Sequence, residues 1–414
     1  MSDPGVGLIG CGTVGSAVVD RWRSGAFPAG ARLLGVAVRD LARERGLAGL
    51  RVTSDALALV ADREVAVVVE ASGDTELGLR VCEAAFAAGK HVVTAGKDLV
   101  ARHGTALEDA AARQGVAFRY EAAVAAAVPI VALLRHRLSP GDLLGFTGVL
   151  NGTCNFVLGE LAAGRPFSEA IREARERGFA EADSRRDTSG RDSADKVAIL
   201  ARLLGARVSP EDVRFDGIEA LDPDDFAYGR RRGWALRLVG SFHDRGAHAT
   251  AGVAPSFVPE SSLLARARGA ENAIVLQSAH AGDVGLIGPG AGGAPTATAL
   301  LADVAAVVRE GAGRPLPCPR EVAIAEDAAP RRHYVRADVP PGAGRALLQR
   351  LHDRGLAPES VTSPRTGRFQ LVTGPVPTPA LRAALAAAAG PAVVLPVIED
   401  TAAAIAGGAG RPAA

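Results

Sequence analysis

The sequence has 414 residues, a formal net charge of +1 at pH 7 and an aromatic content of 4%. Its length predicts two or three domains. Its balanced, scattered charge and few aromatic side chains exclude nucleic acid and an anionic membrane as partners. The longest apolar run, residues 122–134, contains Pro129 and is too short to span a bilayer.

Cysteine usage indicates a reducing compartment. Cys11, Cys82, Cys154 and Cys318 are far apart and form no C-x-x-C pair, which favours free thiols over a disulfide framework or a zinc site. The N-terminal segment MSDPGVGLIG lacks the pattern of a secretory signal. We therefore expect a cytoplasmic protein.

The first predicted strand, residues 6–9, leads directly into a glycine-rich turn. Gly10, Gly12 and Gly15 form G-x-G-x-x-G between this strand and a helix with apolar periodicity. The glycines permit a tight turn and a close approach of the backbone to a pyrophosphate, which then lies at the positive end of the helix. The turn predicts a dinucleotide site formed by Gly10, Gly12, Thr13, Val14 and Gly15.

The residues after the second predicted strand, residues 33–38, bear on the choice of cofactor. An acidic residue at this strand end would bind the adenosine ribose of NAD, whereas an arginine suits the 2′-phosphate of NADP. Arg39 comes first and Asp40 second. NADP is therefore the favoured cofactor, and Asp40 keeps NAD as an alternative. The competing interpretation of Arg39 is an ordinary loop charge.

Further apolar strands at residues 65–69, 91–94 and 116–120 alternate with helices as far as about residue 140. This alternation predicts a Rossmann-type, doubly wound parallel sheet over residues 1–140. Ligands of such sheets bind at the carboxyl ends of the strands. Ser72 and Lys97 follow two of these ends, so we expect both at the cofactor.

A second glycine-rich loop, residues 288–293, is expected to approach the cofactor through Gly290. It opens a predicted helix over residues 295–308, and residues 288–320 would complete the first domain. The competing interpretation of this loop is a flexible hinge.

Residues 141–287 read as a separate α+β domain with antiparallel strands. The predicted strands are residues 143–150, 235–242, 247–253 and 273–278. From about 330 to 402 the strands and helices follow the order βαββαβ, which is typical of a ferredoxin-like domain. Residues 403–414 are expected to form a flexible tail.

Residues 178–200 concentrate charged side chains around an unusual lysine. Only three of the 47 basic residues are lysines, namely Lys90, Lys97 and Lys196. Arginine cannot release its proton in a protein, whereas a lysine can. Asp192 and Lys196 are four residues apart and would share a helix face. The competing interpretation is a solvated surface ion pair worth ~0.3–0.5 kcal/mol.

Taken together, these motifs resemble the homoserine dehydrogenase family over nearly the whole chain. The matching segments are GLIGCGTVGSAVV, GKHVVTAGK, YEAAVAAAVPI, LNGTCNFVL, GFAEAD…G-x-D…K-x-AIL and GPGAGGAPTATAL. The resemblance implies NAD(P)H-dependent reduction of L-aspartate 4-semialdehyde to L-homoserine, in the biosynthesis of threonine, methionine and isoleucine. It also implies a homodimer, with residues 141–287 as the catalytic and dimerisation domain, and an ACT-like C-terminal domain.

The resemblance also implies roles for individual residues. Lys196 would donate the proton to the aldehyde oxygen, and Lys97 would be a second catalytic lysine beside the nicotinamide. The implied substrate-binding residues are Glu181, Asp192, Asn151, Gly152 and Thr153. The implied site for a monovalent cation, Na⁺ or K⁺, is Glu121 with the backbone of Val124, Ala126 and Val128.

The chain departs from the family pattern at a few positions. Gly96 replaces an asparagine, Asp74 replaces a glycine, and Arg185 and Arg186 replace small or apolar residues. The turn at residues 339–342 differs from that of effector-binding ACT domains. Two alternatives therefore stay open, a divergent paralogue acting on another small amino-acid semialdehyde or hydroxy-amino acid and a catalytically silent regulator. Retention of both candidate lysines opposes the second alternative.

Overall fold

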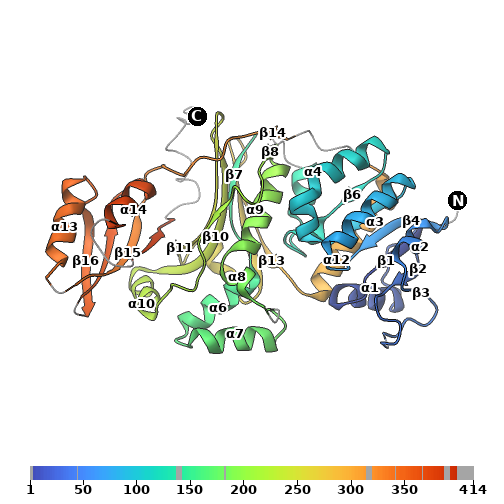
Figure 1. The fold of residues 1–414 in the computed structure, drawn as a ribbon, viewed down its shortest axis with the longest axis horizontal. Coiled ribbons are helices and arrows are strands. Elements are labelled where there is room, and N and C mark those ends of the chain that lie inside the picture. Colours follow the sequence, from blue (N-terminus) through green and yellow to red (C-terminus); the bar gives the residue numbers. More distant parts are fainter. Residues whose placement is uncertain are drawn as a thin grey trace. The chain divides into compact units, whose positions relative to one another are not determined.

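The computed structural model describes residues 3–43, 45–136, 142–180, 183–313, 319–340, 342–365, 367–386 and 392–398. The chain forms two compact units (Figure 1). The first comprises Met1–Pro140, Ala198–Pro210 and Gly288–Arg320, and the second comprises Gly141–Val197, Glu211–Ile287 and Glu321–Ala414. In the described part of the chain, no helix has both the length and the apolarity needed to cross a membrane.

The first unit contains a six-stranded parallel sheet with the strand order β3-β2-β1-β4-β5-β6. Its strands are β1 (Gly5–Ile9), β2 (Arg32–Ala37), β3 (Arg51–Thr53), β4 (Val65–Glu70), β5 (His91–Thr94) and β6 (Phe118–Arg119). Its helices are α1 (Thr13–Arg23), α2 (Ala56–Ala61), α3 (Thr75–Ala87), α4 (Lys97–Arg113), the 3₁₀ helix η1 (Glu121–Ala123), α5 (Ile130–His136) and α12 (Gly293–Glu310). The predicted doubly wound, Rossmann-type sheet is confirmed.

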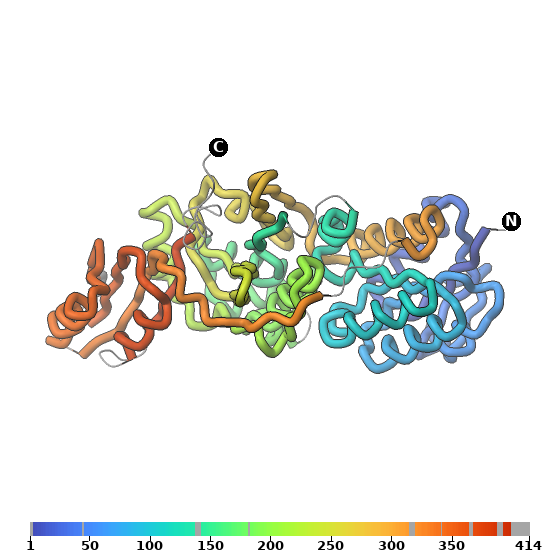
Figure 2. The backbone as a smooth tube through the Cα atoms, turned by 90° about the horizontal axis from the view of Figure 1, so that it is seen from above, coloured from blue at the N-terminus to red at the C-terminus, as the bar shows by residue number. Residues whose placement is uncertain are grey.

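Helices cover both faces of this sheet. Figure 1 shows α3 and α4 on one face and α1 with α12 on the other. Valine and leucine side chains of β1, β2 and β4 pack against α1 and α12 in one apolar core, whose central strand β1 is buried throughout. In Figure 2, α12 (orange) lies along the blue N-terminal segment, although nearly 270 residues separate the two helices. Residues 293–310 therefore complete the core of the first unit, far along the chain from the strands that they cover.

Residues 198–210 group with the first unit, although the sequence placed them in the 141–287 domain. Arg202 of this segment is buried among residues of the first unit. Its Nη1 donates to the carbonyl of Val100 at 3.0 Å, its Nε lies 3.4 Å from Glu108 Oε2, and its guanidinium stacks over the ring of Tyr120. Apolar periodicity could not separate these helical turns from the preceding ones.

The second unit is built on another six-stranded sheet, with the order β13-β12-β7-β10-β11-β9. Its strands are β7 (Leu143–Val149), β9 (Arg214–Phe215), β10 (Trp234–Asp244), β11 (Ala249–Pro259), β12 (Glu271–Ser278) and β13 (Gly282–Pro289). Its helices are α6 (Gly152–Ala162), α7 (Phe167–Glu176), α8 (Arg185–Thr188), α10 (Pro223–Arg232) and α11 (Leu263–Arg266), together with α9 (Arg191–Leu203), which continues into the first unit. Two short strands, β8 (Ala206–Arg207) and β14 (Arg320–Glu321), form a separate pair.

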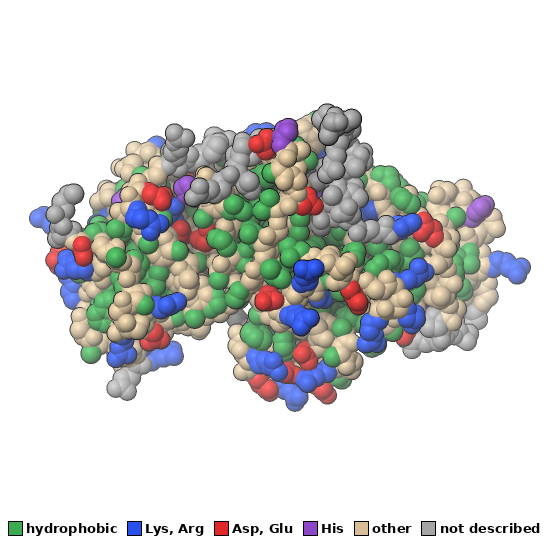
Figure 3. Space-filling view, turned by 180° about the vertical axis from the view of Figure 1, so that it is seen from behind, with side chains coloured by type: hydrophobic (Ala, Val, Ile, Leu, Met, Phe, Trp, Pro, Cys, Tyr) green, Lys and Arg blue, Asp and Glu red, His purple; other side chains and the backbone are tan. Residues whose placement is uncertain are grey.

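Most pairings of this sheet are antiparallel, as predicted, and two strands were missed. β9 is only two residues long, and β13 includes Gly288 and Pro289, which the sequence assigned to the second glycine-rich loop. The loop is therefore shorter than expected and begins at Gly290. Below the sheet, α7 presents interleaved acidic and basic side chains to solvent (Figure 3), including the pairs Arg165–Glu173 and Arg177–Glu173.

The C-terminal segment forms a four-stranded antiparallel sheet in the order β16-β17-β15-β18. Its elements are β15 (His333–Asp338), α13 (Gly344–Asp353), β16 (Pro358–Arg365), β17 (Arg368–Thr373), α14 (Thr378–Ala386) and β18 (Ala392–Pro396). This is the split βαβ arrangement predicted from the sequence. Leu347, Leu351, Leu381 and Leu385 from the two helices pack on the sheet in a core of their own. The predicted tail, residues 403–414, lies outside the described residues.

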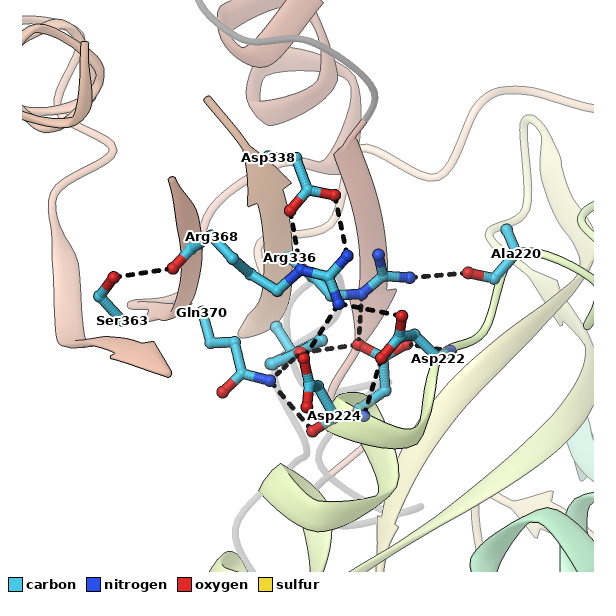
Figure 4. Close-up of polar contacts among 10 residues, drawn as sticks. Ala220, Asp222, Asp224, Arg336, Asp338, Ser363, Arg368 and Gln370 are labelled. Atoms are coloured by element: carbon cyan, nitrogen blue, oxygen red, sulfur yellow. Dashed lines mark hydrogen bonds and ion pairs between the residues drawn. The ribbon is translucent and has the colours of Figure 1, made fainter. Parts of the chain in front are cut away.

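A buried ion pair joins this sheet to α10 (Figure 4). Asp225 in the first turn of α10 has no exposed surface, and its Oδ1 accepts hydrogen bonds from Tyr334 Oη at 2.7 Å and Arg336 Nε at 2.8 Å. Arg336 also donates to the carbonyl of Ala220 at 2.7 Å. Around this pair, Arg368 reaches Asp222, Asp224 and Asp338. We call these residues the α10 clamp.

The α10 clamp predicts a large difference between two conservative substitutions. Asp225→Asn should lower the free energy of unfolding by about 3–5 kcal/mol, because it leaves the buried Arg336 guanidinium without its counter-ion. Asp338→Asn should cost less than about 1 kcal/mol, because Asp338 is half exposed and Arg368 keeps two other carboxylates. Urea unfolding of both variants measures the difference, and equal losses would show that Asp225 is not the centre of the clamp.

Candidate active site

The glycines of the first turn each meet a different steric requirement. Gly10 has φ +95°, and a Cβ there would lie 2.5 Å from the carbonyl oxygen of Ala71. A Cβ on Gly15 would lie 2.1 Å from the carbonyl oxygen of Gly10, so this glycine lets α1 pack against the turn. A Cβ on Gly12 would meet no atom within 4 Å. Gly12 therefore borders open space at the start of α1, where a phosphate can approach the helix end.

A second helix begins beside the same turn. Gly293, the first residue of α12, lies so close to α1 that a Cβ there would be 2.9 Å from the carbonyl oxygen of Thr13. The preceding Gly292 has φ +112°, and Gly290 is buried. The positive ends of two helix dipoles thus meet at the glycine-rich turn, which favours a bound anion.

A cavity of about 420 Å³ opens from this turn. Of the predicted cofactor residues, Gly10, Gly12, Arg39 and Ser72 line it, whereas Thr13, Val14, Gly15, Lys97 and Gly290 do not. Cys11, Asp40, Arg43, Arg45, Asp74 and Leu77 are among its other lining residues.

Arg43 and Arg45 were missed by the sequence analysis, although they follow Arg39 within one short loop. Three arginine residues therefore line the cavity beside the end of β2. The Asp40 carboxylate accepts the backbone N–H of Ala42 at 2.9 Å, so one of its oxygens is already engaged within the loop. This arrangement favours a ligand with an additional phosphate over one with a free ribose hydroxyl.

Lys97 is the first residue of α4 and follows the carboxyl end of β5. Its side chain is one-quarter exposed, and its Nζ lies 4.0 Å from Asp98 Oδ1. The residue before it, Gly96, is the N-cap of the helix and donates its N–H to Thr94 Oγ1 at 2.8 Å. Lys97 thus lies at the sheet edge where its sequence position predicts.

In the second unit, Asp192 and Lys196 form a buried ion pair rather than a surface pair. Lys196 Nζ lies 3.3 Å from Asp192 Oδ2, and both side chains are about one-tenth exposed. The ammonium also donates to the carbonyl of Leu150 at 2.6 Å. The alternative of a solvated helix face is therefore wrong.

Asn151 connects this pair to a second carboxylate. Its amide nitrogen donates to Asp187 Oδ1 and to Asp192 Oδ2, both at 2.8 Å. Its amide oxygen accepts the N–H of Cys154 at 2.7 Å and so caps α6. One side chain therefore fixes the start of a helix and orients two carboxylates beside the ammonium of Lys196.

Asp187 was not among the predicted site residues, although it lies in the same charged stretch. Two carboxylates and one ammonium give the cluster a formal charge of −1, which suits a ligand that carries an amine. Of the other predicted residues, Thr153 donates its hydroxyl to the carbonyl of Phe179, and Gly152 packs closely against Ala270. Glu181 lies outside the described residues.

The two arginines that depart from the family pattern are engaged in ion pairs. Arg185 forms a salt bridge to Asp183 on the surface, and Arg186 Nη2 lies 2.9 Å from Asp195 Oδ2. Their positive charges are therefore balanced locally.

Glu121 is buried and holds the start of α5. Its carboxylate oxygens accept the N–H groups of Val131 at 2.9 Å and Ala132 at 2.6 Å, and its own N–H donates to Asp303. Burial, together with the nearby charge of Asp303, raises the pKa of Glu121 to about 7.

In the loop that follows Glu121, Ala126 has φ +46°. Val124 and Val128 are buried in the same loop. Among the described residues, no group of three or more His, Cys, Asp or Glu side chains is arranged to hold a metal ion.

Comparison with known proteins adds independent evidence. The family model for homoserine dehydrogenase matches residues 129–305, and the model for the homoserine dehydrogenase NAD binding domain matches residues 10–121. Homoserine dehydrogenase of Corynebacterium glutamicum is 37% identical over 319 residues, which cover 74% of this chain and 72% of that protein. The Bacillus subtilis enzyme is 35% identical over 314 residues, which cover 73% and 72%.

Solved structures of the same enzyme share the fold. A homoserine dehydrogenase from Thiobacillus denitrificans superimposes with a TM-score of 0.87 at 30% identity, over 95% of this chain and 98% of that chain. A hyperthermophilic archaeal homoserine dehydrogenase in complex with NADPH gives a TM-score of 0.63 at 24% identity, over 76% and 99% of the two chains.

Proposed function

This chain belongs to the homoserine dehydrogenase family, and on that basis we propose catalytic and binding roles for its residues. The enzyme is an NAD(P)-dependent oxidoreductase acting on a CH–OH group, and it reduces L-aspartate 4-semialdehyde to L-homoserine. The observation that carries the proposal is the buried ammonium of Lys196, held between Asp192 and the carbonyl of Leu150.

Lys196 is proposed as the proton donor. When bound, the nicotinamide supplies a hydride to the aldehyde carbon, so negative charge develops on the aldehyde oxygen. An ammonium stabilises that charge and can then donate its proton to the oxygen. Water is largely excluded around Lys196, which strengthens both effects. Lys97 is proposed as a second catalytic lysine, on the grounds of its place at the carboxyl end of β5.

The carboxylates of the cluster are proposed to bind the substrate ammonium. Asp187 and Asp192 are oriented by the Asn151 amide, and Glu181 is proposed to join them. Gly152 and Thr153 are proposed to shape the same pocket, because they begin α6 directly after Asn151. A substrate that carries both an amine and a reactive aldehyde thus finds carboxylates for one end and an ammonium for the other.

A matched pair of lysine substitutions tests the proton donor. Lys196→Arg keeps the positive charge but cannot release a proton, so kcat for semialdehyde reduction should fall by about 10²–10⁴-fold. The dissociation constant for NADPH should stay unchanged. Lys90→Arg is the control, because Lys90 donates to the carbonyls of Val60 and Asp62 within the first unit.

The same assay tests the enzyme itself. Wild-type protein should oxidise L-homoserine with NADP⁺, and a folded, NADPH-binding protein without this turnover would favour a paralogue with another substrate. A Lys196→Arg variant with full turnover would remove Lys196 from the role of proton donor.

NADP is proposed as the preferred cofactor. Arg39, Arg43 and Arg45 line the cavity that opens from the glycine-rich turn, and guanidinium groups bind phosphate oxygens by charge-assisted hydrogen bonds. The distant archaeal relative with bound NADPH has the same fold. NAD remains the alternative through Asp40.

Replacement of Arg39 should therefore change the cofactor preference rather than the chemistry. Arg39→Ala should lower the ratio of kcat/KM with NADP⁺ to that with NAD⁺ by about 10- to 100-fold, the loss expected for one charge-assisted hydrogen bond. The exposed Arg63, which does not line the cavity, provides the control as Arg63→Ala. An unchanged ratio would assign Arg39 to an ordinary loop charge.

A monovalent cation, Na⁺ or K⁺, is proposed at Glu121 with the backbone of Val124, Ala126 and Val128. Two buried carboxyl groups, Glu121 and Asp303, support this proposal. Burial raises their pKa values to about 7 and about 6. A bound cation would stabilise the charged form of Glu121.

The raised pKa of Glu121 predicts how stability depends on pH without the cation. The folded state keeps a proton on Glu121 between its ordinary pKa of 4.5 and about 7, while the unfolded state loses it. The stabilisation is therefore fully present below pH 4.5 and is lost as the pH rises through 7, on the order of 3 kcal/mol in total. Glu121→Gln should remove the contribution of Glu121 to this slope and leave that of Asp303, whose pKa burial raises to about 6. K⁺ should flatten the slope of the wild type relative to tetramethylammonium. An identical slope in both salts would contradict the cation site.

The C-terminal sheet is proposed as an ACT-like domain because of its strand order β16-β17-β15-β18, and the enzyme is proposed to be a homodimer, as the family resemblance implies. Sedimentation equilibrium of the full chain distinguishes a dimer from a monomer.

A further inference from the structure

Glu70 is a buried carboxylate that has no role in the function proposed above. It is the last residue of β4, follows a continuous run of valines and is only 1% exposed. Among the residues that the structure describes, its partners are hydroxyl and N–H groups, and no cation lies within ion-pair distance. A buried charge is costly unless it is satisfied by hydrogen bonds, so these contacts explain how the chain tolerates it.

The two oxygens of Glu70 hold two different turns. Oε1 accepts the backbone N–H of Ser72 at 2.8 Å and the hydroxyl of Ser72 at 2.6 Å. Oε2 accepts the hydroxyl of Thr94, the last residue of β5, at 2.6 Å. Thr94 Oγ1 in turn accepts the N–H of Gly96 at 2.8 Å.

Each of these turns leads to a residue of the proposed site. Ser72 lines the cofactor cavity, and its hydroxyl accepts the N–H of Asp74, whose carboxylate caps α3. Gly96 is the N-cap of α4, and Lys97 is the first residue of that helix. One carboxylate thus connects the cofactor-lining turn after β4 to the turn that begins the helix of Lys97.

The chain also makes room for the carboxylate. A Cβ on Gly96 would lie 3.0 Å from Glu70 Oε2, and a Cβ on Gly78 of α3 would lie 3.4 Å from its carboxyl carbon. Gly96 stands where the family resemblance predicts an asparagine, so this departure gives the carboxylate space at the N-cap of α4.

We propose that Glu70 is a positioning residue that sets the Ser72 turn and the Lys97 helix start relative to each other. Its effect on turnover passes through Lys97 and its effect on nucleotide binding passes through Ser72, so the proposal rests on the roles proposed for these two residues. Hydride transfer depends steeply on the placement of catalytic groups, and a fixed spacing between the two turns provides it.

Substitution of Glu70 by glutamine separates this role from simple packing. The amide has nearly the same shape but only one acceptor oxygen. Its NH₂ group must therefore either face the backbone N–H of Ser72 or make the hydroxyl of Thr94 accept instead of donate. We expect Glu70→Gln to raise the KM and the dissociation constant for NADPH about tenfold and to lower kcat about tenfold. Glu64→Gln, at an exposed position just before β4, is the matched control and should leave all three values unchanged.

Thr94→Val tests the second turn without touching the first. It removes the hydroxyl between Glu70 and Gly96 and keeps the β-branched shape, so kcat should fall while the NADPH constants stay as in the wild type. In the double variant Glu70→Gln/Thr94→Val, kcat should fall no further than in Glu70→Gln alone, because both changes break one connection.

Three results would overturn the proposal. A lower melting temperature of Glu70→Gln with unchanged kcat and KM would show a purely structural role. Losses of kcat that multiply in the double variant would show that the two residues act independently. If Glu70→Gln does not fold, an unchanged kcat in Thr94→Val still contradicts the proposal. The NADPH dissociation constant, measured by fluorescence, tests the Ser72 turn even if the wild type does not turn over homoserine.

Discussion

The candidate site in the second unit depends on a buried ammonium and a buried carboxylate, Lys196 and Asp192, with the partly exposed carboxylate of Asp187 beside them. Desolvation of such groups costs several kcal/mol for each ion unless every charge finds partners. Lys196 finds the carbonyl of Leu150 and the carboxylate of Asp192, and Asn151 supplies a donor to Asp192 and Asp187. The end of β7, the start of α6, the short α8 and α9 must therefore meet correctly for the charges to be stable. The arrangement of these elements that stabilises the buried charges is also the arrangement that the proposed reaction requires.

Much of the fold could be predicted because its signals are local. The turn with Gly10, Gly12 and Gly15 stands between a strand and a helix, and the continuous apolar runs predict strands buried on both faces. β13 was missed because its glycines and Asp283 resemble a loop, and its strand character comes from pairing with β12. The last turns of α9 group with the first unit, where Arg202 contacts Val100, and apolar periodicity does not reveal this contact.

The sequence singled out several residues of the candidate site but could not predict their environment. The rarity of lysine singled out Lys97 and Lys196, yet burial of the pair with Asp192 depends on a carbonyl 46 residues away. Asp187 becomes significant only through its contact with Asn151 on another helix. Glu70 was not singled out from the sequence, because its partner Thr94 lies on the neighbouring strand. Contacts between distant segments decide which of many charged residues are functional.

The α10 clamp has a consequence for how this architecture can change over generations. Asp225 is fully buried, and its carboxylate accepts hydrogen bonds from Tyr334 and Arg336 of the C-terminal sheet. A homologue without that sheet would expose the acidic first turn of α10 to solvent. A homologue in which Asp225 were replaced by a neutral residue would leave the buried Arg336 without its counter-ion. The first turn of α10 and strand β15 should therefore co-vary, and the sheet is transferable between proteins only together with its acceptor helix.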